Sequence, residues 1–467
     1  MLIVRMEKDL LGEKEVPIDA YYGIQTIRAK ENFPITGYTP HTTLIKALAM
    51  VKKASAQTNL ELGLLDKKIG SAIIEASEEV IEGKFDDQFI VDVIQGGAGT
   101  SLNMNANEVI ANRAIEILGG KKGNYLLVSP NTHVNMAQST NDVFPTAIRI
   151  AILTLVEGLY KELAALEESF NKKAKEFDDV VKVGRTHLQD AVPIRLGQEF
   201  AAYGKAIARD MKRIELLARD LTEINLGATA VGTGLNAKKE YIDRVAVILR
   251  EISGLPLKKA ENLVDATQNT DNLAAFSSSL KILALNLSKV ANDLRLMASG
   301  PRNGFNEINL PPMQPGSSIM PGKVNPVIPE VVNQVAFQVI GNDQTIALAV
   351  QAGQLELNVM EPVIVFNLIQ SLTVLTNVVK IFRERCIDGI TANKEHCLEM
   401  VEKSVGIITV LNPYIGYEKS SLLAQEVLAG NQSVTEIVEQ KGLLSKEEIK
   451  TIFSPKAMTE PGVMSKD

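Results

Sequence analysis

The sequence predicts an all-α fold of three consecutive domains. Between about Pro145 and Ile390, apolar residues recur at spacings of three and four over long stretches, which is typical of amphipathic helices. Convincing strand alternation is scarce, and no internal repeat is visible. We therefore expect mostly helical domains over residues 1–139, 140–392 and 393–467.

The N-terminal and C-terminal parts are predicted to contain shorter helices. Before residue 140 the helical patterns are interrupted by turn-rich stretches such as NFPITGYTPH and LGGKKGN. After about residue 392 the breaks fall at LNPYIGYE, LAGNQ and FSPKAMTEPG. Both parts read as small helical domains that flank a longer central one.

The central part predicts an extended helix bundle. Its first apolar stripe spans about six helical turns and consists of Ile148, Ile152, Leu155, Leu159, Leu163, Leu166 and Phe170. Comparable patterns run through residues 195–224, 273–299, 328–352 and 361–386. Helices of this length favour a bundle that packs side by side.

The fourth of these stretches indicates oligomerisation. Residues 328–352 are apolar nearly all round but include Asn333, Gln334, Gln338 and Asn342. A helix of this composition is covered on most sides. If one chain's bundle cannot supply that cover, other copies must, so we expect a homo-oligomer with a helical core.

Composition and charge exclude several classes of protein. The chain has 467 residues, a formal charge of −7, 45% hydrophobic residues and 22% charged residues. Such a balance is typical of a soluble globular protein and gives no general attraction to nucleic acid or to an anionic membrane. Charges interrupt the N-terminal stretch where a signal peptide would need apolar residues, and no run of 18 apolar residues occurs. We expect a cytoplasmic protein that binds neither nucleic acid nor membrane.

Cysteine and histidine usage gives no sign of a metal centre. Cys386 and Cys397 are too few for a disulfide framework. The four histidines are scattered, without an HExxH or CxxC pattern. We expect no bound metal, and no nucleotide, flavin or pyridoxal motif indicates a cofactor.

Two stretches concentrate polar side chains at predicted helix starts. In GGAGTSLNMNANE (96–108), Thr100 follows a glycine-rich turn, and the simplest interpretation is a helix N-cap. The asparagines that follow Thr100 are poor choices for a helix interior. In QSTND (138–142), Ser139, Thr140, Asn141 and Asp142 crowd a helix start. One of them suffices to cap the helix, so three polar side chains are spare. A helix start with spare donors suits a carboxylate or phosphate.

A third stretch, GRTHLQD (184–190), places Thr186 and His187 in a polar loop ahead of another long helix. A lone histidine is more often structural than functional. The neighbouring threonine favours a binding role here.

The fourth stretch, GSSIMPGKVNP (316–326), predicts a loop that opens and closes on its glycines. It is not a phosphate-binding P-loop, because Val324 stands where that motif needs a serine or threonine. Taken alone, it is equally a connector between helices. Together, the four stretches supply donors and cations without metal ligands, which suits a small substrate with several carboxylates and a reaction that builds negative charge.

These four segments, in this order, resemble the active-site segments of the fumarase/aspartase superfamily. GSSIMPGKVNP is similar to the signature of that superfamily, and GIITVLNPYIGYE resembles its C-terminal part. GGAGTSLNMN, QSTND and LNVMEP are similar to the aspartase branch rather than to fumarases. The resemblance covers essentially the whole chain.

The resemblance implies a fold and an assembly. Subunits of the superfamily have three helical domains, and four subunits form a core of twenty helices. Each active site is assembled from three subunits. The expected assembly is therefore a homotetramer.

The resemblance also implies a reaction: reversible deamination of L-aspartate to fumarate and ammonia through an aci-carboxylate intermediate. It assigns the base to Ser317, with catalytic roles also for His187 and Lys323. Glu330 is similar to the carboxylate that orients the corresponding histidine. The implied substrate-binding residues are Thr100, Ser139, Thr140, Asn141, Thr186, Ser318, Lys323 and Asn325.

Alternative functions remain open at the level of sequence. A class II fumarase, which dehydrates L-malate, shares nearly every implied residue. Argininosuccinate and adenylosuccinate lyases share the serine loop but diverge elsewhere. A helical assembly without activity, as in lens crystallins related to this superfamily, has no need of Ser317, Lys323, Asn325 or His187.

Overall fold

The computed structural model describes residues 3–430 and 432–462. The chain forms two compact units, each assembled from three segments. The first unit consists of Met1–Tyr160, Lys212–Ala284 and Phe337–Thr376, and the second of Lys161–Met211, Leu285–Ala336 and Asn377–Asp467. The division into domains 1–139, 140–392 and 393–467 stays a prediction.

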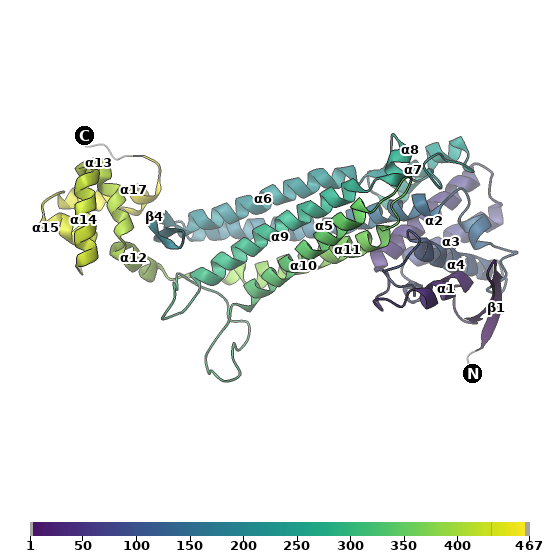
Figure 1. Ribbon diagram of the computed structural model, residues 1–467, viewed down its shortest axis with the longest axis horizontal. Coiled ribbons are helices and arrows are strands. Elements are labelled where there is room, and N and C mark those ends of the chain that lie inside the picture. The colour runs from purple at the N-terminus through teal and green to yellow at the C-terminus, as the bar shows by residue number, and fades with distance from the viewer. Residues whose placement is uncertain (1–2, 431, 463–467) are drawn as a thin grey trace. The chain divides into compact units, whose positions relative to one another are not determined.

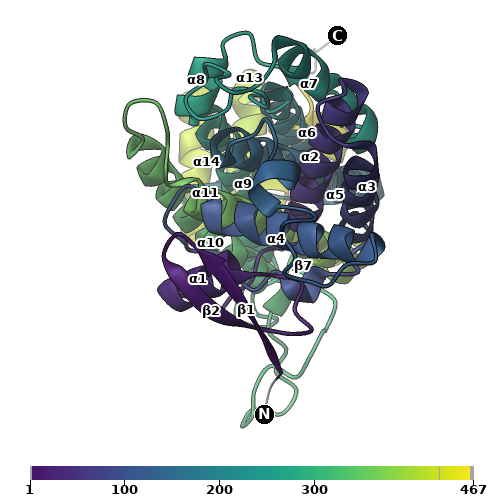
Figure 2. The ribbon, with the colours of Figure 1, turned by 90° about the vertical axis from the view of Figure 1, so that its right-hand side faces the viewer.

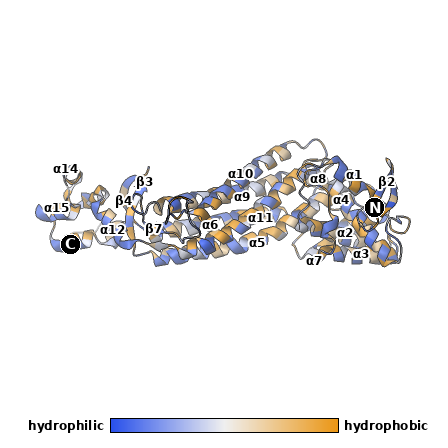
Figure 3. Ribbon diagram, turned by 90° about the horizontal axis from the view of Figure 1, so that it is seen from below, coloured by the Kyte–Doolittle hydropathy of each residue, from blue (hydrophilic) through white to orange (hydrophobic). Residues whose placement is uncertain are grey.

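Long helices dominate both units, which confirms the predicted all-α class (Figure 1). Within the described ranges the five longest are α5 (Thr140–Glu176), α6 (Leu196–Asp220), α9 (Asp271–Met297), α10 (Val327–Gln351) and α11 (Glu361–Arg385). Each lies within a few residues of a predicted stretch and contributes residues to both units. Apolar residues, drawn in orange, recur along α5 and α11 in Figure 3. The three-and-four periodicity therefore located the bundle correctly.

The first unit begins with a hairpin beside a short helix. Strands β1 (Val4–Asp9) and β2 (Gly12–Pro17) pair antiparallel and contact α1 (Ile24–Asn32), as Figure 2 shows. The start of α1 is held by Glu108, whose carboxylate accepts hydrogen bonds from the backbone of Gly23, Gln25 and Thr26. An anion stabilises a helix N-terminus. Burial nevertheless raises the pKa of Glu108 to about 7.

Shorter helices complete the first unit. They are α2 (Thr42–Glu61), α3 (Lys67–Ile81), η1 (Asp86–Gln88), α4 (Thr100–Ile117), the π-helix η2 (Pro130–Val134), α7 (Lys239–Ser253) and α8 (Leu263–Gln268). Helix α2 packs against α3, α4 and α7. The parallel pair β5 (Glu223–Ile224) and β6 (Lys258–Lys259) lies between helical segments of the same unit.

The second unit carries a hairpin that the sequence analysis did not predict. Strands β3 (Val181–Thr186) and β4 (Gln189–Arg195) pair antiparallel, with a register shift between Val183 and Arg185. Burial alternates too weakly along β4 for the strand to be read from a period of two. The expected polar loop around His187 is in fact the tip of this hairpin.

The C-terminal helices pack against the β3–β4 hairpin. They are η3 (Ile387–Gly389), α12 (Lys394–Lys403), η4 (Val405–Leu411), α13 (Asn412–Ile415), α14 (Tyr417–Ala429), α15 (Val434–Gln440), α16 (Lys446–Ile452) and α17 (Pro455–Thr459). Val181 and Val183 of β3 share one buried apolar cluster with Ile407, Leu411 and Val434. A small pair, β7 (Ile308–Asn309) with β8 (Thr391–Ala392), lies in the same unit. The hairpin tip therefore rests on a packed base.

Two helical segments among the described residues are long and apolar enough to cross a membrane by length and composition: Thr140–Glu176 and Glu361–Gly389. Their most apolar windows are 72% and 61% buried inside the protein. Core helices of soluble bundles meet the same criterion, so the segments are weak evidence for a membrane protein.

Candidate active site

The sequence-predicted residues lie in four places, two of them in the first unit. Thr100 is the first residue of α4, and Thr140 is the first residue of α5, directly after Ser139. Thr186 and His187 belong to the β3–β4 hairpin of the second unit, and Ser317 belongs to the loop that precedes α10. All four places are helix starts, strand ends or loops.

A glycine brings the starts of α4 and α5 together. Gly99 has φ +87°, and a Cβ atom at this position would lie 2.5 Å from the ring of Phe144 in α5. The N-cap residue of α4 is Gly99 rather than Thr100, which corrects the expected cap. The hydroxyl of Thr100 instead donates to the carbonyl of Gly97 at 2.7 Å. Thr100 remains exposed at the first turn.

The asparagines in α4 are explained by buried hydrogen bonds. Asn105 accepts from the backbone nitrogen of Ile90 and donates to the carbonyl of Gln88. Asn103 donates to the hydroxyl oxygen of Thr140 at 2.9 Å. Asparagine weakens a helix interior by its propensity, and these contacts supply the reason for its presence.

The polar residues at the start of α5 are mostly engaged with backbone. Ser139 Oγ accepts from the nitrogen of Asn141, and the Asn141 side chain donates to the carbonyl of Ala230 at 2.7 Å. Asp142 accepts from the nitrogens of Ser139, Gly227 and Thr229. Burial raises the pKa of Asp142 to about 6, against the opposing effect of these hydrogen bonds. Fewer polar side chains here are therefore free to bind a ligand than the sequence suggested.

The hairpin tip is a two-residue turn with an unusual backbone. His187 and Leu188 have φ +55° and +57°, which are left-handed values. Two-residue hairpin loops of type I′ need positive φ at both positions and favour Asn-Gly there. A histidine and a leucine in this conformation are strained, and such strain concentrates at functional sites. Thr186 and His187 are both exposed.

A buried carboxylate anchors the strand that leads to this tip. Glu307, whose side chain is fully buried, lies 2.5 Å from the guanidinium of Arg185 and 2.8 Å from the ammonium of Lys182. The Arg185 guanidinium also lies over the ring of Phe305, 4.1 Å from its centroid. These contacts hold the residue next to Thr186 in place.

The serine loop is closed at its base. The nitrogen of Gly316 donates to the carbonyl of Lys323 at 2.7 Å, and the Asn325 side chain donates to the carbonyl of Gly316 at 2.7 Å. A Cβ atom at Gly316 would lie 2.8 Å from backbone atoms of both partners, so only glycine fits. Figure 1 shows the loop projecting from the helices near the start of α10.

Ser317 faces backbone donors within this loop. Its Oγ accepts hydrogen bonds from the nitrogens of Ile319 at 3.2 Å and Met320 at 3.0 Å. Ser318 and Lys323 are exposed. Two N–H groups aimed at one hydroxyl oxygen favour its anionic form.

Glu330 lies in the first turn of α10 and is half-buried. Among the described residues, no hydrogen bond or ion pair joins it to His187. Its orienting role stays a prediction.

Metal ligation finds no support in the described residues. Within residues 3–430 and 432–462, no group of three or more His, Cys, Asp or Glu side chains could hold a metal ion.

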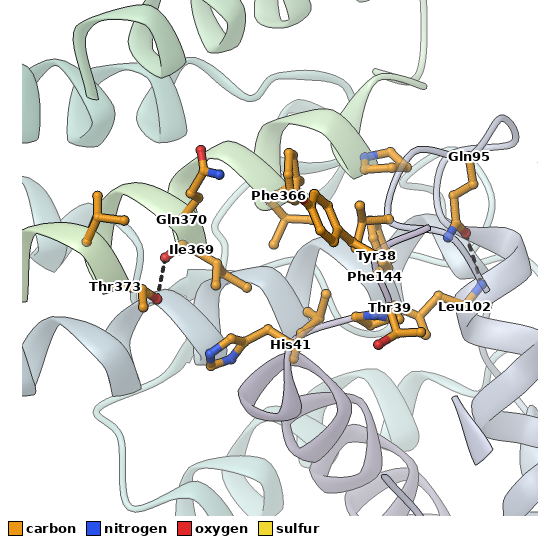
Figure 4. Close-up of a pocket in the computed structure, with 16 residues that line it drawn as sticks. Tyr38, Thr39, His41, Gln95, Leu102, Phe144, Phe366, Ile369, Gln370 and Thr373 are labelled. Carbon is orange, nitrogen blue, oxygen red and sulfur yellow. Dashed lines mark hydrogen bonds between the residues drawn. The ribbon is translucent and has the colours of Figure 1, made fainter. Parts of the chain in front are cut away.

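A well-formed apolar pocket lies elsewhere in the first unit (Figure 4). It has a volume of about 400 Å³. Tyr38, Phe144, Phe366 and Ile369 line it, and Gln95 at its edge accepts from the nitrogen of Leu102 at 3.0 Å. None of the predicted site residues lines this pocket, and no charged side chain is among its walls. It does not suit a dianionic substrate.

Sequence reasoning missed one group that contacts the segment before Thr140. Lys52 of α2 is fully buried and donates to Asn135 and Gln138. The only sequence signal is a lysine at a position that helical periodicity assigns to the core, between Leu48 and Ser55.

The predicted site residues offer hydroxyl, amide and lysine groups on a scaffold of long helices, and comparisons with known families give the class of protein. The family model described as Lyase matches residues 12–341, and the model of the fumarase C C-terminus matches residues 407–460. The chain belongs to this lyase family, the fumarase/aspartase superfamily. The resemblance drawn from the four segments is confirmed.

Two individual relatives are similar to this chain over nearly its full length. The chain is 62% identical to an aspartate ammonia-lyase from a Bacillus species over 98% of both chains. It is 60% identical to the aspartate ammonia-lyase of Bacillus subtilis strain 168, over 99% of this chain and 98% of the relative.

Solved structures share the fold. The fumarate lyase:delta crystallin from Brucella melitensis bound to cobalt has a TM-score of 0.96 at 49% identity and covers 98% of this chain and 100% of its own. The class II fumarase from Schistosoma mansoni has a TM-score of 0.93 at 36% identity, covering 97% and 99% of the two chains.

Proposed function

We propose that this protein is a carbon–nitrogen lyase that reversibly deaminates L-aspartate to fumarate and ammonia. The observation that carries the proposal is the sequence identity of this chain to relatives of different activity. Relatives named aspartate ammonia-lyase are 50–62% identical over nearly the whole chain, whereas the class II fumarase of known structure is 36% identical. The aspartase-like segments of the sequence favour the same substrate.

In the proposed reaction, Ser317 acts as an alkoxide base. It takes a proton from Cβ of the substrate, and the electron pair of the C–H bond moves into the neighbouring carboxylate to give the aci-carboxylate. Collapse of this dianion forms the C=C bond and breaks the C–N bond, and the nitrogen leaves as ammonia. The proton then passes from Ser317 to ammonia or solvent. The N–H groups of Ile319 and Met320 support the assignment of the base.

The remaining residues are proposed to bind the two carboxylates and the amine. Thr100, Ser139, Thr140 and Ser318 hold the β-carboxylate and its dianionic form. Lys323, Asn325 and Thr186 hold the α-carboxylate. Asn141 and His187 lie near the amino group, and Glu330 orients His187. Preorganised donors around a developing dianion supply the largest catalytic effect in such reactions.

We also propose a homotetramer in which three subunits contribute to each site. Support comes from α10, which is apolar but leaves one face uncovered within the chain. Gln334, Phe337, Gly341, Gln344 and Leu348 recur at spacings of three and four and are all exposed. Phe337 and Leu348 are 64% and 59% exposed on this face, and in the proposed tetramer a partner subunit covers them.

The proposed site takes a dicarboxylate and needs neither metal nor cofactor. The proposed location is the cytoplasm, where a protein with two buried free cysteines stays reduced.

The deciding experiment measures fumarate by its ultraviolet absorbance. Purified protein is given L-aspartate in one cuvette and L-malate in another. Fumarate from aspartate alone supports the proposal. Fumarate from malate alone would make the protein a fumarase, and formation from neither would exclude both activities.

A further inference from the structure

A buried lysine donates hydrogen bonds to the segment that leads into α5. Lys52 has no exposed surface, and its Nζ donates to Asn135 Oδ1 at 3.0 Å and to Gln138 Oε1 at 2.9 Å. Both acceptors lie in the segment that leads into Thr140. Within the described residues, no carboxylate lies within ion-pair distance of this amine.

The amine fixes the orientation of the Asn135 amide. Lysine presents only donors when charged, and its neutral amine still has an N–H for each of the two oxygens. Asn135 Oδ1 must therefore face Lys52. The same oxygen accepts from Asn103 at 3.4 Å and from Asn107 at 3.2 Å, while Asn135 Nδ2 donates to the carbonyl of Gln138.

Asn103 transmits this orientation to Thr140. Its Nδ2 donates both to Asn135 Oδ1 and to Thr140 Oγ, the latter at 2.9 Å. If the amide were turned over, its oxygen would face the oxygen of Asn135, which is repulsive. Thr140 Oγ is thus an acceptor toward Asn103. No acceptor for the Thr140 hydroxyl hydrogen lies among the described residues, so this hydrogen is free to point at a ligand.

We propose that Lys52 is a positioning residue: through Asn135 and Asn103 it makes the Thr140 hydroxyl a donor to the carboxylate of the substrate. The proposal rests on the proposed function, in which Thr140 binds the β-carboxylate. We call this chain of hydrogen bonds the relay. It runs from Lys52 in α2 through Asn135 and then Asn103 in α4 to Thr140 in α5. At each step, the donor or acceptor role of one group sets the role of the next.

Packing alone does not call for an amine at this position. A buried cation costs more than an apolar side chain of the same size unless it is well paired. Burial lowers the pKa of Lys52 to about 7, and attraction to Asp142 only partly opposes this effect. A methionine would fill the same space without the cost.

The first test uses Lys52→Met, with Lys53→Met as the matched control. Lys53 is the next residue in α2, and its partly buried ammonium pairs with the exposed carboxylate of Glu78. We expect Lys52→Met to lower kcat for L-aspartate by about 10- to 100-fold, with a smaller change in KM, because the hydroxyl matters most when the carboxylate becomes dianionic. Lys53→Met should match wild type. Wild-type kcat in a folded Lys52→Met protein would overturn the proposal.

A double-mutant cycle separates the relay from a structural role. In a Thr140→Ala background there is no hydroxyl to orient, so adding Lys52→Met should lower kcat no further. Multiplicative losses would show that Lys52 acts by another route. Asn103→Asp, which can only accept from Thr140, should lose more activity than Asn103→Leu; equal losses would also contradict the relay.

The relay can be tested even if the proposed activity on L-aspartate proves wrong. If wild type converts malate and not aspartate, the same cycle is run with malate. If it converts neither, the affinity for fumarate is measured by calorimetry. Weaker fumarate binding by Lys52→Met than by Lys53→Met then supports the relay, and equal binding overturns it.

Discussion

Met320 donates its backbone N–H to the side-chain oxygen of Ser317 across 3.0 Å, and Ile319 donates to the same oxygen. Serine ionises far above neutral pH, so an alkoxide needs donors of this kind. The loop supplies them from its own backbone. In the proposed mechanism, Lys323 and closure of the loop over the substrate add to this stabilisation.

Removing the proposed base should have the largest effect on the rate. We expect Ser317→Ala to lower kcat by more than about 10³, and Thr140→Ala by about 10² to 10³, the usual loss for one oxyanion donor. Fumarate absorbance reports the rate, and size-exclusion chromatography checks that each variant keeps the assembly. Near wild-type activity in assembled Ser317→Ala would exclude this serine as the base.

Mixed assemblies test whether sites are shared between subunits. Thr140 and Ser317 belong to different units of the chain. If each site takes them from different subunits, unfolding and reassembling equal amounts of Thr140→Ala and Ser317→Ala should regain about one quarter of wild-type activity, as random assembly requires. No gain over the separate variants would mean that one chain supplies both residues.

The close approach of α4 and α5 depends on Gly99. Gly99→Ala imposes a left-handed backbone on alanine and also places Cβ 2.5 Å from the Phe144 ring. Gly119→Ala is the control, because φ is +79° but no atom lies within 4 Å of the added Cβ. We expect about 1 kcal/mol of destabilisation for Gly119→Ala and about 2–4 kcal/mol for Gly99→Ala. Equal thermal midpoints for the two variants would argue against close packing at Gly99.

Lys52 makes stability depend on pH in a defined direction. Its pKa is lowered from 10.5 to about 7 by burial. Between these values the unfolded chain holds a proton that the folded chain has released, so raising the pH favours folding. The thermal midpoint of Lys52→Met minus that of wild type should therefore be more positive at pH 7 than at pH 9.5. A difference that stays constant or grows with pH would mean that the lysine stays charged in the folded protein.

The uncovered face of α10 should be an interface. A charge at its centre, as in Phe337→Glu, places a carboxylate where the proposed tetramer buries an aromatic ring, which is strongly unfavourable. Sedimentation should show species smaller than the wild-type assembly. The control is Leu422→Glu in α14, also exposed but outside the bundle. A Phe337→Glu protein that sediments like wild type would leave this face without a partner.

The sequence predicted the helices far better than the hairpins. Long helices have a strong period, and residues such as Ile152 and Leu163 lie where that period places them in the core. The β3–β4 hairpin escaped notice because its tip, His187-Leu188, lacks the Asn-Gly signal of such turns. Its stability comes from distant partners such as Glu307 and Leu411, which a local pattern cannot reveal.

The motifs supplied the proposed site residues, which stay predictions, but the hydrogen bonds that orient them could not be predicted from the sequence. A lysine at a core position can be read from periodicity, whereas its link to Thr140 needs the packing of α2 on α4. Likewise, the Asn141 side chain looked spare in the sequence and turns out to bind the carbonyl of Ala230. Such pairings join residues far apart in the chain.

Every proposed substrate contact lies at a helix start, a hairpin tip or a loop, and none lies in the middle of a long helix. In the proposed reaction, no chemical group therefore comes from the interior of a long helix, whether α5, α6, α9, α10 or α11. In such a protein, stability and specificity can be engineered separately. Substitutions inside the bundle can raise heat tolerance, while changes at the helix starts and in the serine loop can alter which leaving group is accepted.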